Sequence, residues 1–304
     1  MKFISLLIIT SFLNLQSSHA KVLQEGWYQI LSGQQHVGYL VQRYDFNESK
    51  KQFKFTSFMK TNALGGDVTE SVDATASDTF APVSYQYTTL VGKSNKFIDA
   101  SFKGDSMTAK ITERGETKTL QEKLKSKEVF LSYFLVYKIL QHKTGLKSGL
   151  SLEYDAIAEE DAKTSKGYVD VKEMESMNGV EAFKVLNRFK DVKSISHITP
   201  IGEVLQVKQP VTGLQLKAAT REEATKGFPS SDKSIKALFV TVPPDSHFSK
   251  SVTSAKPKEQ AAPTDGEKKV EFTEPSTTLP KGTTIPPGKG LPPKKQIEEN
   301  NSEQ

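Results

Sequence analysis

Turn-forming residues recur along most of this chain at intervals of roughly 8–12 residues and divide it into strand-length segments. Glycine, asparagine and aspartate mark the turns, for example at residues 32–35, 47–50 and 64–67. The segments between them, such as 53–59 and 83–91, are rich in β-branched and aromatic residues, which favour strands. The sequence therefore predicts a mainly β fold whose curved antiparallel sheet forms a half-barrel or an open barrel.

One segment, residues 126–143, departs from this pattern and is predicted to be an apolar helix. Ser126 suits the N-cap, and Glu128 would lie in the first turn, where the helix dipole favours a negative charge. Lys143 and Gly145 suit the end of the helix. Apolar residues occupy far more than one stripe between these ends, so the helix must be covered on most sides. We expect it to pack across the concave face of the sheet.

The strand pattern resumes after this segment. Runs from residue 150 to residue 218 again alternate with turn residues. Residues 220–224 suit a short helix or a turn, and residues 235–242 suit a last strand.

The two ends of the chain differ in composition from its body. Lys2, the apolar run 3–15 and the small residues that end at Ala20 predict a signal peptide, residues 1–20, cleaved after Ala20. This run is shorter than the roughly 20 apolar residues of a membrane-spanning helix. Residues 250–304 hold eight of the fourteen prolines together with many Lys and Glu residues, which predicts a disordered tail.

These ends leave residues 21–249 as a β-rich globular body. The body forms either one domain or two halves that divide near residues 125–145. We expect a periplasmic protein without a transmembrane helix in its mature form.

Composition excludes several kinds of chemistry. The chain has no cysteine, which rules out thiol nucleophiles, disulfides and cysteine-bound zinc. Its four histidines after residue 20 show no metal-binding spacing, and neither a phosphate loop nor a GxSxG motif is present. The formal net charge of +5 is spread along the chain, unlike a nucleic-acid-binding patch. We expect no cofactor, no metal site and no nucleic-acid partner. The acidic runs 159–161 and 222–223 could serve acid–base chemistry, but adjacent acids in a polar loop are more often solvated surface residues, and this is the interpretation we favour.

Aromatic residues supply the strongest candidate for a binding site. They concentrate in the N-terminal strands and in segment 126–143, where a sheet and a helix would enclose a concave, apolar place of the kind that binds ligands. The alternative is that these rings fill the core. The predicted groove residues are Trp27, Tyr39, Phe55, Tyr87, Phe130, Phe134 and Tyr137.

Short motifs at both ends of the body carry a resemblance to a known group of proteins. Residues 26–28 and 33–39, which read GWY and GQQHVGY, resemble the opening of exported bacterial β-domains of unknown function. Such domains precede transglutaminase-like domains in some proteins and stand alone in others. Residues 199–205 and 220–224 resemble the closing hairpin and exit of the same domain. The catalytic cysteine of the neighbouring domain is missing here, so its activity is not implied.

The expected plan of a curved sheet with an apolar helix is also similar to the lipoprotein-carrier half-barrels of the periplasm. The sequence therefore predicts a non-enzymatic periplasmic protein that binds a lipid or another apolar envelope ligand between sheet and helix. An alternative is an envelope scaffold whose tail, residues 250–304, binds an envelope protein or the cell wall. A hydrolase is the less favoured third hypothesis.

Overall fold

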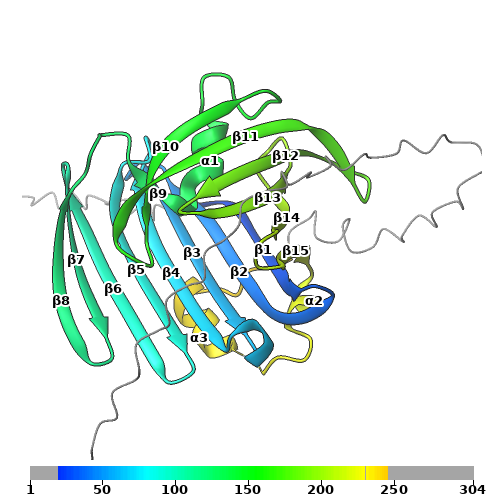
Figure 1. Ribbon diagram of the computed structural model, residues 1–304, viewed down its shortest axis with the longest axis horizontal. Coiled ribbons are helices and arrows are strands. Elements are labelled where there is room, and N and C mark those ends of the chain that lie inside the picture. Colours follow the sequence, from blue (N-terminus) through cyan, green and yellow to red (C-terminus); the bar gives the residue numbers. More distant parts are fainter. Residues whose placement is uncertain (1–19, 230, 246–304) are drawn as a thin grey trace, which may run out of the picture. The chain divides into compact units, whose positions relative to one another are not determined.

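The computed structural model describes residues 20–229 and 231–245 of the 304. The body of the predicted signal peptide and the predicted tail lie outside the described residues. The described strands form one sheet in the order β8-β7-β6-β5-β4-β3-β2-β1-β15-β14-β13-β12-β11-β10-β9 (Figure 1). Each strand pairs with its neighbour in antiparallel fashion, except that β9 lies parallel to β10.

The bounds of the elements follow chain order. The first strands are β1 (Lys21–Ser32), β2 (Gln35–Asn47), β3 (Gln52–Thr61), β4 (Val68–Ser77), β5 (Pro82–Val91), β6 (Ser94–Lys103), β7 (Ser106–Glu113) and β8 (Glu116–Lys123). The later strands are β9 (Phe130–Leu131), β10 (Ser151–Ala158), β11 (Lys163–Met177), β12 (Val180–Phe189), β13 (Val192–Ile198), β14 (Val204–Gln209) and β15 (Leu214–Ala219). The helices are the 3₁₀ helices η1 (Ala63–Gly65) and η2 (Ser132–Phe134) and the α-helices α1 (Leu135–Leu140), α2 (Arg221–Thr225) and α3 (Asp232–Phe239).

The prediction of a mainly β, antiparallel open sheet is confirmed. Strands β1–β8 and β10–β15 coincide with the segments expected from the turn spacing. The sheet is continuous through both parts of the body because β15 returns to pair with β1, with Trp27 opposite Ala219. The longest helix in the described part of the chain is α3, with 8 residues, and none there has the length and apolar character needed to cross a bilayer.

The predicted helix over residues 126–143 is wrong in extent. Only Leu135–Leu140 is α-helical, preceded by η2 and by the short strand β9. Ser126 does not start a helix, although its Oγ accepts a hydrogen bond from the backbone N–H of Glu128 at 3.1 Å. An apolar run suits a buried strand as well as a buried helix. Here β9 pairs with the edge of β10, and that tertiary pairing decides the conformation.

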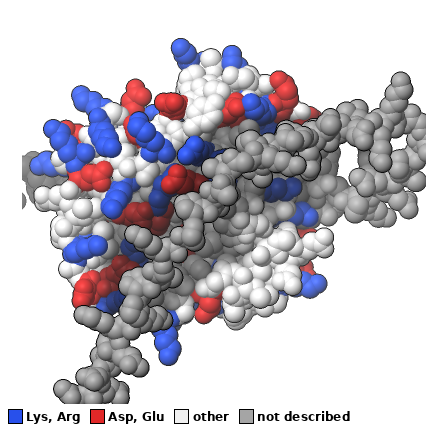
Figure 2. Space-filling view, viewed as in Figure 1, with Lys and Arg blue, Asp and Glu red and all other residues white. Residues whose placement is uncertain are grey.

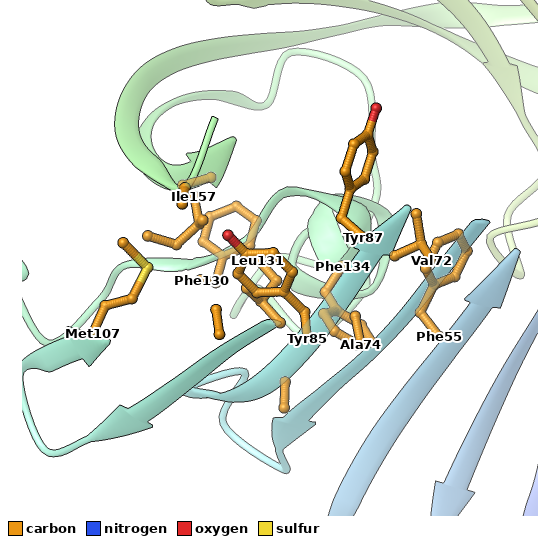
Figure 3. Packing of buried hydrophobic residues seen from close by; sticks show 14 of the residues in the cluster. Phe55, Val72, Ala74, Tyr85, Tyr87, Met107, Phe130, Leu131, Phe134 and Ile157 are labelled. Atoms are coloured by element: carbon orange, nitrogen blue, oxygen red, sulfur yellow. The ribbon is translucent and has the colours of Figure 1, made fainter. Parts of the chain in front are cut away.

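The inner face of the sheet, defined as the face that packs on β9, η2 and α1, carries the largest apolar core. Side chains from β2–β7 form one cluster with Phe130, Leu131 and Phe134. Figure 3 shows part of this cluster, with labelled residues of β3, β4, β5 and β7 around these three. Phe134 has no exposed surface. The rings of Phe55 and Tyr133 stack with centroids 4.6 Å apart. The segment from β9 to α1 therefore acts as a plug that fills the inner face.

The opposite side of α1 packs on the second part of the sheet. Ile139 joins Val169 and Val185 of β11 and β12 in a separate apolar cluster. Leu135 contacts both this cluster and the inner-face core. The short helix is therefore covered on most sides, as the sequence predicts for so apolar a segment.

The outer face of β1–β3 is covered by α2 and α3. Here the predicted strand over residues 235–242 is wrong, because Asp232–Phe239 forms α3. Ile235 and Phe239 pack against Trp27 and Phe58 of the sheet. The apolar residues at 235, 238, 239 and 242 have the i, i+3, i+4, i+7 spacing of an amphipathic helix, and burial against the sheet selects this conformation. The short helix expected at residues 220–224 is present as α2.

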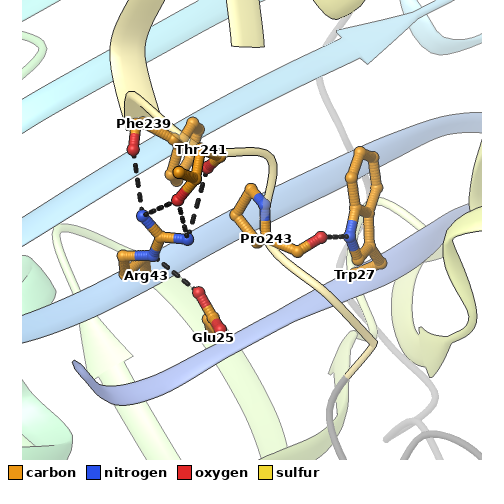
Figure 4. Close-up of polar contacts among 6 residues, drawn as sticks. All are labelled: Glu25, Trp27, Arg43, Phe239, Thr241 and Pro243. Atoms are coloured by element: carbon orange, nitrogen blue, oxygen red, sulfur yellow. Dashed lines mark hydrogen bonds and ion pairs between the residues drawn. The ribbon is translucent and has the colours of Figure 1, made fainter. Parts of the chain in front are cut away.

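Arg43 of β2 anchors the chain where α3 ends (Figure 4). Its Nη1 donates to the carbonyl oxygen of Phe239 at 3.0 Å, and its Nη2 donates to that of Thr241 at 3.3 Å. Its Nε donates to Glu25 Oε2 at 2.6 Å. Between the two carbonyls, Val240 has φ 65° and ψ −51°, and Thr241 N–H bonds to Phe239 O. This is a γ-turn, which is strained for a β-branched residue. The Arg43 guanidinium stabilises it through hydrogen bonds to the carbonyl oxygens of the residues before and after Val240.

Candidate functional site

The structure places the seven predicted groove residues on two faces of the sheet. Phe55, Tyr87, Phe130 and Phe134 belong to the inner-face core, and Tyr137 packs against it. Trp27 and Tyr39 belong to the outer-face cluster with α3. Five of the seven therefore come together, and the other two are separated from them by the thickness of the sheet.

Trp27 has a structural partner of its own on the outer face. Its indole Nε1 donates a hydrogen bond to the carbonyl oxygen of Pro243 at 2.8 Å (Figure 4). The Arg221 guanidinium lies over the Trp27 ring, 5.5 Å from its centroid. These contacts attach the segment after α3 to β1.

A cleft with a volume of about 1130 Å³ opens on the far side of the plug. Segment 126–130 and α1 form one wall, and β10–β12 form the other. Of the seven predicted residues, only Phe130 lines this cleft. Its lining comprises Thr79, Phe80, Ser126, Glu128, Phe130, Leu135, Lys138, Ile139, Gln141, His142, Lys143, Leu152, Glu153, Tyr154, Asp155, Lys166, Gly167, Tyr168, Arg188, Lys190 and Asp191.

The floor of the cleft is apolar and centres on Tyr154 of β10. The Tyr154 ring lies between those of Phe130 and Phe189, at centroid distances of 5.5 and 5.9 Å. Its hydroxyl donates to Asn187 Oδ1 at 2.7 Å. Gly167 on the adjacent strand permits this arrangement, because a Cβ at that position would overlap the Tyr154 ring. The floor is thus a built aromatic surface rather than a loose gap.

The sheet wall of the cleft carries charges that are mostly paired. Lys166 Nζ lies 3.6 Å from Asp155 Oδ1, and Arg188 Nη2 lies 3.6 Å from Asp191 Oδ1. Lys190 pairs with Glu160 and Asp161 at the β10–β11 turn. The lining acids Glu128 and Glu153 are exposed. On the face of the molecule seen in Figure 2, basic and acidic side chains are likewise intermixed.

The α1 segment, residues 135–143, differs because it contributes two lysines and a histidine but no acid to the lining, whereas Glu128 on the preceding segment 126–130 is exposed. Lys138, His142 and Lys143 line the cleft from this side. Lys138 is half-buried, and its Nζ lies 5.6 Å from the centroid of the Phe130 ring. Within the described ranges, neither Lys138 nor Lys143 has a carboxylate at ion-pairing distance.

Glu159, which follows β10, belongs to the first acidic run noted in the sequence. Its side chain is 0% exposed. Its Oε2 accepts a hydrogen bond from Ser132 Oγ at 2.6 Å, and its Oε1 has no hydrogen-bond partner among the described residues. Burial raises the pKa of this carboxyl to about 8, and the bond from Ser132 opposes the rise. Glu159 is therefore largely protonated at neutral pH.

Three other acids of these runs have structural contacts, and Glu222 is exposed. Glu160 and Asp161 pair with Lys190. Glu223 completes a capping box with Thr220 at the start of α2. No group of three or more His, Asp or Glu side chains in the described part of the chain is placed to hold a metal ion.

Sequence reasoning missed most of the cleft. Lys138 carried a detectable signal, as a single charge inside the apolar stretch 129–140. Tyr154, Gly167 and Leu152 come from strands of ordinary alternation, and only their register brings them to the floor. The sequence held no local sign of that register.

Comparisons with known proteins find little similarity. No protein-family model matches the chain, and no curated protein matches it. One solved structure with a similar fold is described as a beta-barrel-like protein of domain of unknown function DUF1849 from Brucella abortus. The likeness has a TM-score of 0.46 at 9% sequence identity and covers 64% of this chain and 93% of that one. Likeness at this level assigns neither ligand nor activity.

Proposed function

We propose that this chain is a non-enzymatic, exported binding protein that holds a lipid-like ligand in the cleft between α1 and β10–β12. The observation that carries the proposal is the cleft itself, which combines an aromatic and aliphatic floor with a charged wall on either side. Export to the periplasm rests on the predicted signal peptide.

The size of the cleft supports a ligand with a sizeable apolar part. Its volume of about 1130 Å³ slightly exceeds the range of about 300–1,000 Å³ common for ligand pockets. Burial of ten methylene groups on such a floor contributes about 8 kcal/mol. Association costs about 4–15 kcal/mol. The apolar contribution exceeds the lower end of this range but not the upper end, so polar contacts at the walls have to add to it.

The floor residues define how the ligand would lie. Leu135, Leu152 and Tyr154 are half-buried, so part of each remains available for contact. Phe130 and Ile139 beneath them are 1% exposed and serve as support. An acyl chain on this floor would replace water against rings already locked by packing and by the bond from Tyr154 to Asn187.

The test is mass spectrometry of an organic extract from the natively purified protein, expressed as the full chain. We expect a near-stoichiometric lipid. Leu152→Glu places a charge on the floor and should remove the lipid. The matched control is Leu90→Glu at a 45% exposed position of β5 outside the cleft, which should retain it. Thermal unfolding of all three proteins checks that the fold persists.

A second variant guards against loss of the fold in Leu152→Glu. Leu152→Trp keeps the floor apolar but fills the cleft, and it should also lower the lipid content. A clean extract from the wild type, together with no uptake of added laurate, would contradict the proposal. In that case the scaffold hypothesis, in which residues 250–304 bind an envelope partner, becomes the better one.

A further inference from the structure

The charge of the two cleft walls points to the class of ligand, an inference that rests on the function proposed above. We propose that the ligand is an anionic amphiphile, whose carboxylate or phosphate headgroup binds the basic wall formed by Lys138, His142 and Lys143 of the α1 segment. Its apolar chain lies on the floor around Tyr154.

The first support is the position of Lys138. It is half-buried, and its ammonium lies over the Phe130 ring at the margin of the apolar floor. A cation in this position has given up part of its hydration, and the ring replaces only a fraction of it. An anionic oxygen is the natural partner for such a group, and no described carboxylate supplies one.

The second support is the contrast between the walls. On the sheet wall, Lys166 and Arg188 each face an aspartate, and Lys190 faces two acids. Lys138 and Lys143 of the α1 segment have no carboxylate at ion-pairing distance among the described residues. Lysine at a helix C-terminus also interacts favourably with the helix dipole, which accounts for a basic residue near the end of α1. It does not account for the placement of Lys138 over the cleft floor.

The third support is the geometry of the floor relative to this wall. The Tyr154 ring and the Lys138 ammonium both lie against Phe130, at 5.5 and 5.6 Å from its ring centroid. A chain that lies along the aromatic floor therefore ends beside Lys138. Glu128 and Glu153, the acids of the lining without a described ion pair, are exposed, so water and salt screen their repulsion of an anion.

The experiment compares laurate with its neutral glycerol ester, monolaurin, which share one acyl chain. Calorimetric titration of the purified full chain, with co-purified lipid removed, should show that laurate binds about tenfold or more tightly, in keeping with a charge-assisted contact. Lys138→Gln should abolish this preference by lowering the affinity for laurate to about that for monolaurin. Lys138→Arg should restore it. The control is Lys118→Gln, an exposed position of β8, which should behave as the wild type.

Four outcomes would overturn the inference. Equal affinity for laurate and monolaurin, or a preference that survives Lys138→Gln, removes the role of the basic wall while the proposed lipid-binding function stands. Inorganic phosphate alone that binds as tightly as laurate would identify a site for free anions rather than amphiphiles. If neither laurate nor monolaurin binds, the proposed function fails with it.

Discussion

Replacement of Glu159 by glutamine tests how the β10–β11 turn is held in the interior. The carboxyl has no exposed surface, and its Oε2 accepts the hydroxyl proton of Ser132. Glutamine keeps the shape and one carbonyl oxygen for that bond but stays neutral at every pH. The variant therefore imitates the protonated acid permanently.

The magnitude follows from the difference in pKa between the two states. The pKa of Glu159 is about 8 in the folded protein, against 4.5 for a free glutamate side chain. Between these values the folded state keeps a proton that the unfolded state releases, so the free energy of unfolding falls as pH rises. At 1.36 kcal/mol per pH unit, the loss is about 3 kcal/mol at pH 7 and on the order of 5 kcal/mol above pH 8. Below pH 4.5 this contribution is fully present.

The assay is urea-induced unfolding of the wild type and Glu159→Gln at pH 5, 7 and 9. The difference between the two proteins cancels the titration of groups common to both, such as Glu70, whose pKa is also raised by burial. We expect the relative stability of the variant to increase by a few kcal/mol from pH 5 to pH 9. Glu160→Gln, at the neighbouring half-exposed position, should not reproduce this gain.

A stability difference that stays constant from pH 5 to pH 9 would refute the reasoning. It would mean that Glu159 titrates alike in the folded and unfolded states, and hence that water or another polar group reaches its Oε1.

Three further changes test the packing. Gly167→Ala should destabilise the fold by about 1–3 kcal/mol because its Cβ would displace the Tyr154 ring. Urea unfolding measures this loss, and a variant as stable as the wild type would contradict the close contact. Arg43→Met should lower the free energy of unfolding by about 3–5 kcal/mol, since it leaves the largely buried Glu25 carboxylate without its cation. Limited proteolysis should then release the segment after α3. A variant as resistant to the protease as the wild type would argue against the anchor. Phe134→Ala should cost about 3–5 kcal/mol in chemical denaturation, and a loss below about 1 kcal/mol would show that the plug does not fill the inner face.

The strands could be read from the sequence because their signals are local. A run such as β3 alternates between two faces within ten residues, and turn residues mark its ends regardless of what packs on it. The capping residues of α2 act at equally short range, between Thr220 and Glu223. These features need no knowledge of the partner strands.

The errors arose where the same residues satisfy two local structures. Residues 126–143 are apolar enough to form a helix that is buried on most sides. The strand β9 forms there instead, because the edge of β10 provides hydrogen-bond partners for its backbone. Residues 235–242 are rich in strand-forming residues, yet Ile235 and Phe239 reach the sheet together only when they lie on one helical face. Burial against a distant surface decided each case.

The candidate site shows the same division. The sequence alone determined that the chain is mainly β, with an antiparallel sheet and an apolar segment packed on it, and that it lacks thiol chemistry. It also supplied the aromatic residues, but it did not determine which of them share a face. Tertiary structure separated Trp27 and Tyr39 from Phe55 and Phe134, and brought Lys138 against the cleft floor. The physical reason is that strand periodicity is a property of neighbouring residues, whereas the cleft depends on strand register and on how far the sheet curls, which only long-range packing determines.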